Sequence, residues 1–159
     1  MTPRDHALAI LEFTRWYSNN LLKDLPEAKW TFQPSPTDNH ILWCMGHLAG
    51  TEAWLGSLLG FDAQVPEPVA KAYGQHSKPS PTGNPPAADV KRAFEASRSA
   101  FVQWLRTAKD PALTINLKEK SGGFFTDPID AAFKLAWHEG FHFGQVANVR
   151  KALALPPSM

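Results

Sequence analysis

Two histidines near the end of the 159-residue chain, His138 and His142, have the spacing of a metal-ligand pair. Residues four apart lie on one face of an α-helix, with Cβ atoms about 5–6 Å apart. At that separation two imidazole rings can reach one metal ion at a Zn–N distance of about 2.0–2.1 Å. The pair indicates a metal site if the segment is helical, if both histidines face inward, and if a third ligand comes from elsewhere.

The segment that carries the pair has a strong helix start. Asp127 can cap the first turn, Pro128 suits the first helical position, and no proline follows until Pro156. Apolar residues recur at spacings of three and four together with both histidines, at Ala131, Leu135, Val146 and Val149. This pattern predicts a long helix from residue 128 with both histidines facing inward. Two inward histidines can also be core residues with hydrogen-bond partners, because an unpartnered one costs about 1–3 kcal/mol.

A third histidine, His47, lies on a second predicted helix. Polar residues 37–39 can cap this helix, and Gly60 ends it. Its polar and aromatic face carries His40, Trp43, His47, Thr51, Trp54 and Leu58. Because Glu52 is the only formal charge between residues 40 and 59, we expect the helix to be mostly buried, with His47 facing inward.

Helical bundles build metal sites from side chains on facing helices. We therefore predict a divalent-metal site whose ligands are His47, His138 and His142. Three neutral imidazoles leave the charge of a dication uncompensated, so the site should favour an anionic fourth ligand, either hydroxide or a thiolate.

Two more helices complete an all-α prediction. Residues 2–24 form the first, with Thr2 as its cap and an inward stripe of Ile10, Phe13, Tyr17 and Leu21. Residues 87–108 form the other, whose basic residues, Arg98 among them, are read as a solvated face. The sequence thus predicts a four-helix bundle in a single domain over residues 1–159.

Two connections differ from the helices in composition. Residues 62–86 contain six prolines and read as a long loop between the second and third helices. Between residues 111 and 126 the apolar pattern alternates, which predicts a small hairpin with its turn near Ser121-Gly122-Gly123.

Composition excludes several partners. The net charge of +1 gives no sign of a nucleic-acid footprint. There is no apolar run long enough for a membrane span, and the single cysteine, Cys44, fits a reducing compartment. We therefore expect a cytoplasmic protein without nucleic-acid or membrane partners.

Two motifs resemble the DinB/YfiT-like metalloprotein family. They are Leu42-Trp43-Cys44-Met45-Gly46-His47-Leu48-Ala49 and Ala136-Trp137-His138-Glu139-Gly140-Phe141-His142-Phe143-Gly144-Gln145. The resemblance implies an up-down-down-up four-helix bundle, a divalent metal on three histidines, and frequent homodimers. The metal it implies is Zn²⁺ or Ni²⁺, with Fe, Mn and Co as further candidates.

The resemblance also implies a reaction. Characterised members include S-transferases and an isomerase that activate a small cofactor thiol as thiolate on the metal. The implied function is a thiol-dependent S-transferase acting on a small thiol and an electrophile. Alternatives are a non-catalytic metal-binding or dimerising stress-response protein, and a metal-dependent hydrolase that uses His138-Glu139-x-x-His142.

Other residues near the motifs have open roles. Glu139 could be a base or a carboxylate that supports the ligands, or it could be a solvated or interface charge. Trp43, Trp54 and Gln145 could contact substrate, although core packing would explain the tryptophans and an interior amide the glutamine. Cys44 is read as a small buried hydrophobe in preference to a metal ligand.

Overall fold

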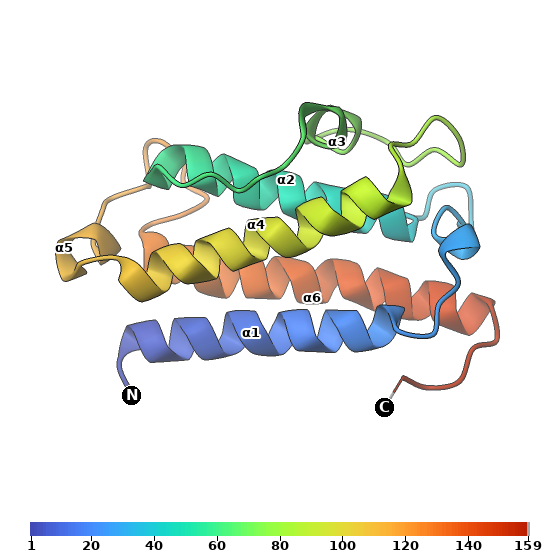
Figure 1. The fold of residues 1–159 in the computed structure, drawn as a ribbon, viewed down its shortest axis with the longest axis horizontal. Helices are drawn as coiled ribbons and strands as arrows, with labels where there is room; N and C mark the ends of the chain where they lie inside the picture. The colour runs from blue at the N-terminus through green and yellow to red at the C-terminus, as the bar shows by residue number, and fades with distance from the viewer. Residues whose placement is uncertain (159) are drawn as a thin grey trace.

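The computed structural model describes residues 1–158, which contain helices and turns but no strand. Its long helices are α1 (Pro3–Leu22), α2 (Ile41–Leu59), α4 (Ala87–Thr107) and α6 (Pro128–Ala152), as Figure 1 shows. Three short helices connect them: η1 (Glu27–Lys29), α3 (Glu67–Ala72) and α5 (Asp110–Leu113). The predicted all-α bundle is confirmed. No helix in the described part of the chain is long and apolar enough to cross a membrane.

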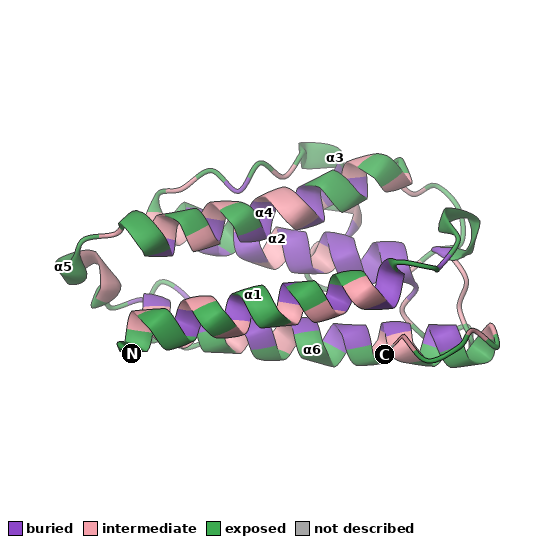
Figure 2. Cartoon of the chain, turned by 60° about the horizontal axis from the view of Figure 1, so that its bottom comes forward, coloured by how far each residue is buried: buried purple, intermediate pink, exposed green. Residues whose placement is uncertain are grey.

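The long helices form two side-by-side pairs, α1 with α6 and α2 with α4. Within each pair the helices run in the same direction, and the two pairs run in opposite directions (Figure 1). Parallel neighbours cannot be joined by a tight turn, because the chain must first return along a helix about 30 Å long at 1.5 Å per residue. Residues 60–86 make that return from α2 to α4, and Figure 2 shows the buried faces of the long helices turned toward each other.

The helix starts follow the capping signals in most cases. Thr2 and Asp5 form a capping box at α1, and the side chain of Asp127 accepts hydrogen bonds from two backbone N–H groups at α6. The expected cap of α2 within residues 37–39 is wrong. His40 takes that place, because its Nδ1 accepts a hydrogen bond from the Trp43 N–H at 3.0 Å.

The two connections are more ordered than predicted. Residues 62–86 include the short helix α3, which Pro68 and an acidic first turn favour, so the prediction of a loop without any element is wrong. The predicted hairpin at residues 111–126 is also wrong. The Ser121 hydroxyl bonds both the N–H and the carbonyl of Phe125, and the positive φ of Gly122 and Gly123 coils the chain into a turn instead of a ladder.

A layer of four buried charges, here called the charge layer, crosses the middle of the bundle. Each long helix contributes one residue: Arg15, Glu52, Arg98 and Glu139. Arg98 Nε lies 2.6 Å from Glu52 Oε1, and Arg98 Nη2 lies 2.7 Å from Glu139 Oε2. Arg15 Nε lies 2.9 Å from Glu139 Oε1. The formal charges of the layer sum to zero, as buried charges require.

The charge layer separates two apolar clusters of the core. On α6, for example, Ala136 belongs to one cluster and Phe143 to the other, and Glu139 lies between them. The same order holds on α1, where Leu11 and Leu21 belong to different clusters on either side of Arg15. The bundle core is therefore apolar, charged and apolar again along its length.

The charge layer corrects two predicted faces. Arg98, expected on the solvated face of α4, is 3% exposed. Phe13, expected inside, is 58% exposed, because α1 turns Arg15 inward and carries Phe13 outward. A sequence pattern places an arginine on the solvent-exposed face of a helix unless a buried partner is known. Here two carboxylates on facing helices allow Arg98 to be buried.

Gly46 lets the segment after α3 approach α2 closely. Tyr73, which follows α3, is 2% exposed, and its ring lies against this glycine. A Cβ built at Gly46 would lie 2.6 Å from Tyr73 Cγ, whereas one built at Gly50 on the same helix would meet nothing within 4 Å. The two glycines therefore differ in the space around them, although as glycines they have the same intrinsic helix propensity.

We expect Gly46→Ala to lower the free energy of unfolding by about 1–3 kcal/mol, because the added methyl group overpacks the Tyr73 ring. Gly50→Ala is the matched control and should be neutral or stabilising by up to about 1 kcal/mol, since alanine favours helix. Urea denaturation of both variants measures the difference. Equal shifts in the two variants would contradict the close packing of Tyr73.

Candidate metal centre

Three histidine rings from two helices meet on one side of the bundle. α2 supplies His47, and α6 supplies His138 and His142. The ring centroids are 5.1 Å apart for His47 and His138, 5.1 Å for His47 and His142, and 4.7 Å for the α6 pair. One nitrogen from each ring lies within 4.8 Å of the others. The structure thus brings the three sequence-predicted ligands together, and they could form a metal site.

The spacing of the α6 pair fits a shared metal ion. Nε2 of His142 lies 3.0 Å from Nε2 of His138. In a tetrahedral site with Zn–N of about 2.0–2.1 Å, two ligand nitrogens are about 3.3 Å apart. Both nitrogens therefore already face a common point at close to the required separation.

The second ring nitrogen of two of these histidines has a partner. His47 Nδ1 lies 3.3 Å from the Tyr73 carbonyl, and His142 Nδ1 lies 3.0 Å from Gln145 Oε1. A ring whose Nδ1–H donates to an oxygen keeps the lone pair on Nε2 for a metal. Within residues 1–158, Nδ1 of His138 is buried and has no hydrogen-bond partner.

The environment keeps all three rings neutral. Burial lowers the pKa of His138 to about 3, with His142 and His47 adding to the effect, and burial lowers the pKa of His142 to about 4. Burial also lowers the pKa of His47. Neutral imidazole is the form that binds metal, so these donors are ready to coordinate near neutral pH.

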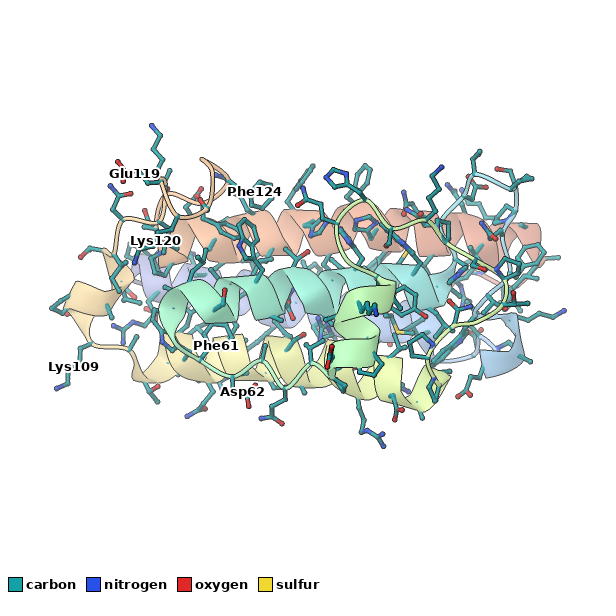
Figure 3. All side chains as sticks on the ribbon, turned by 90° about the horizontal axis from the view of Figure 1, so that it is seen from above. Phe61, Asp62, Lys109, Glu119, Lys120 and Phe124 are labelled. Atoms are coloured by element: carbon teal, nitrogen blue, oxygen red, sulfur yellow. The ribbon has the colours of Figure 1, made fainter. Side chains whose placement is uncertain are left out.

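A covering segment, residues 73–84, lies along the α2 side of the site. Three side chains, two from α2 and one from its cap, form hydrogen bonds to this segment. The order of their partners along the segment is the reverse of their own order along the chain. His47 Nδ1 meets the Tyr73 carbonyl, Trp43 Nε1 donates to Ser77 Oγ at 3.0 Å, and His40 Nε2 lies 2.9 Å from the Ser80 carbonyl. In Figure 3, which looks down on α2, the loop that follows α3 lies over this side of the bundle.

The proposed substrate residues occupy different surroundings. Trp43 stacks on the His47 ring, with centroids 4.6 Å apart and planes 12° apart. Trp54 is 38% exposed and packs against Phe125, with ring centroids 5.2 Å apart, and not against the histidines. Gln145 contacts His142 instead of facing outward from the site.

Cys44 is a buried neighbour of the site. Its Sγ lies 3.6 Å from Gln145 Oε1, and the side chain is fully buried. Burial raises the pKa of Cys44 to about 12, which leaves it a neutral thiol. The three clustered histidines do not include Cys44, and a buried thiol that stays protonated is a poor metal ligand and a poor nucleophile.

Glu139 belongs to the charge layer. It is 0% exposed, so the reading of a solvated charge is wrong. Burial alone would raise its pKa, but Arg98 and Arg15 outweigh burial and hold the pKa below its usual value. A carboxylate held by two guanidinium groups is a weak proton acceptor, and this placement argues against a general-base role.

Sequence reasoning missed several residues around the site. Asn39, whose Nδ2 donates to Gln145 Oε1 at 3.1 Å, had no spacing signal, and neither did the Tyr73 carbonyl. Arg98 did have a spacing signal, because it lies four residues after Phe94 and three before Phe101 on the buried face of α4. That position could have identified it as buried.

Comparison with models of known protein families gives a match. A family model described as the DinB superfamily matches residues 10–146, a span that holds all three histidines. No curated protein and no solved structure matches the chain.

We expect the purified protein to bind about one divalent ion per chain, because three neutral donors converge on one point. His142→Ala should lose the ion, whereas His6→Ala on exposed α1 surface should keep it. Elemental analysis after dialysis measures the stoichiometry. Unchanged metal content in all three single variants, His47→Ala, His138→Ala and His142→Ala, would remove the basis for a site at these rings.

Proposed function

The chain belongs to the DinB superfamily, and from this membership and the three-histidine cluster we propose that it is a metal-dependent S-transferase that uses a small thiol. The observation that carries the proposal is three neutral imidazoles converging without a charged or nucleophilic protein group among them. A divalent ion held there, Zn²⁺ or Ni²⁺ in our proposal, would act as a Lewis acid that lowers the pKa of a thiol toward neutral pH.

The chain's own residues define what must come from outside. Cys44 is the only cysteine, and it is buried and protonated, so the reacting thiol has to be a separate molecule. Glu52 and Glu139 are both paired with arginines, so neither carboxylate can compensate a dication at the histidines. An anionic ligand from solution is therefore favoured, and we propose that it is a thiolate.

Access to the cluster differs between its sides. His142 is buried, whereas His47 and His138 are partly exposed. The covering segment and the stacked Trp43 close the side next to Tyr73. We propose that the thiol and electrophile enter over the remaining side. Trp54 and Phe124, with ring centroids 6.1 Å apart and both partly exposed, would contact an apolar electrophile there, and Figure 3 labels Phe124 at the surface.

A non-catalytic metal-binding role is the alternative from another class. It needs the same three ligands but no thiol binding. The hydrolase alternative requires Glu139 as general base, and pairing of that carboxylate with Arg15 and Arg98 disfavours it.

We also propose a homodimer. Four aromatic side chains on the adjacent helices α1 and α6 are more than half exposed: Phe13, Trp16, Trp137 and Phe141. Phe13 pairs with Trp16, and Trp137 stacks with Phe141 at 5.8 Å. Exposed apolar surface on this scale is unusual for a monomer, and a second copy would cover it.

The reaction test uses a panel of cellular thiols with a chlorinated arene. The expected reaction forms a C–S bond as the C–Cl bond breaks, and chloride and the thiol proton leave to solvent. His138→Ala should abolish the metal-dependent rate, and Cys44→Ser should retain most of it because the buried thiol takes no part. If no thiol changes the absorption spectrum of the cobalt-substituted protein and none is conjugated, the non-catalytic role becomes the better account.

The dimer test uses light scattering at micromolar concentration, where we expect twice the chain mass. Trp137→Lys should shift the population toward monomer, because it places a charge within the apolar contact. Lys91→Glu on exposed α4 surface is the control and should leave the mass unchanged. A monomeric mass for the unmodified protein would contradict the proposed dimer.

A further inference from the structure

One oxygen atom next to the candidate metal site has three hydrogen-bonding partners. Gln145 Oε1 lies 3.0 Å from His142 Nδ1, accepts from Asn39 Nδ2 at 3.1 Å and accepts from Cys44 Sγ at 3.6 Å. The partners come from α6, from the residue before the cap of α2, and from α2 itself. Gln145 therefore joins the helix that carries two candidate ligands to the helix that carries the third.

The direction of the Gln145 amide decides which nitrogen of His142 is free. If Oε1 faces the ring, Nδ1 carries the proton and Nε2 keeps its lone pair. If the amide were reversed, its NH₂ would donate to Nδ1, the ring proton would lie on Nε2, and that nitrogen could not coordinate. The choice matters because His142 Nε2 is the atom that faces His138 Nε2.

The other two ligands do not depend on a side chain in this way. A backbone carbonyl, that of Tyr73, accepts from His47 Nδ1. His138 Nδ1 has no partner among residues 1–158. Apart from the contact between the two α6 rings themselves, Gln145 is thus the one side chain within that part of the chain that contacts a ring nitrogen of the three histidines through an acceptor oxygen.

We propose that Gln145 is a positioning residue that holds His142 in the Nδ1–H tautomer and so prepares Nε2 for the metal. This inference rests on the metal-binding part of the proposed function and replaces the expectation that Gln145 contacts substrate. Asn39 assists by donating to the same oxygen, which keeps the amide from reversing. Such outer partners of metal ligands typically contribute about 10–100-fold in metal affinity.

The test compares two substitutions at one position. Gln145→Leu removes the acceptor and should weaken Co²⁺ binding by about 10–100-fold. Gln145→Glu presents only acceptor oxygens and should bind Co²⁺ at least as tightly as the unmodified protein. Asn148→Leu is the matched control, because Asn148 lies on α6 beside the same small cavity as Gln145 but, within residues 1–158, forms no hydrogen bond with a histidine, and the Co²⁺ affinity of this variant should not change. Thermal unfolding of each apoprotein checks that it is folded.

A second readout needs no metal. Long-range ¹⁵N–¹H spectra of the apoprotein should show His142 as the Nδ1–H tautomer, and Gln145→Leu should give a mixture of both tautomers. Unchanged Co²⁺ affinity in Gln145→Leu would overturn the proposal, as would loss of binding in Gln145→Glu, which would identify the amide nitrogen as the contact.

The two readouts separate the two claims. If the unmodified protein binds no Co²⁺, the proposed function fails, and the tautomer spectra still decide whether Gln145 orients His142. If the unmodified protein binds Co²⁺ and His142 is found as the Nε2–H tautomer, the positioning role of Gln145 is wrong and the metal site stands.

Discussion

The bundle depends on the pairing of four charges at its centre. Each of Arg15, Glu52, Arg98 and Glu139 is buried, and each comes from a different long helix. Removing one partner from a buried pair typically costs about 3–5 kcal/mol, because the remaining charge is left uncompensated in the interior. The four helices can therefore adopt only rotations about their axes that bring all four side chains together. Apolar clusters on both sides supply burial energy, and the charge layer supplies the register.

This constraint reaches the candidate metal centre through α6. Glu139 follows His138 directly, and successive residues on a helix are rotated by about 100°. Because Glu139 is directed to the arginines of α1 and α4, His138 and His142 are directed toward α2, where His47 lies. The charge layer also takes up Glu52 and Glu139, the acidic residues closest in sequence to His47 and to His138. What remains around the three rings is neutral, so the charge of a divalent ion held there would be uncompensated and would favour an anionic ligand from solution.

The topology contributes the cover of the site. Parallel packing of α2 and α4 requires a long return connection, and the chain uses that length to place residues 73–84 beside α2. The segment is held by three hydrogen bonds: Tyr73 with His47, Ser77 with Trp43, and Ser80 with His40. The three partners on α2 and at its cap are three and four residues apart, so they lie on one face of the helix. The segment thus orients His47 through a carbonyl and holds Trp43 against the His47 ring. On the other helix, Gln145 has the corresponding place beside His142.

The sequence alone determined the four long helices and the three candidate ligands. Caps such as Thr2 and Asp127, the prolines, and the period of the apolar residues fixed where three of the four long helices begin, because these signals act over one or two turns. The spacing of His138 and His142 placed both on one face, and the buried pattern around His47 suggested its partner helix. The tertiary structure alone decided what each buried polar group meets. The sequence pattern places Arg98 on a solvated face and leaves Glu139 open between a base, a supporting carboxylate and a solvated or interface charge, but ion pairs between helices place both inside the bundle. The sequence also leaves Gln145 open between a substrate contact and an interior amide, and the structure brings Asn39 and His142 against its oxygen. Such pairings join residues far apart in the chain, and periodicity within one helix carries no information about them.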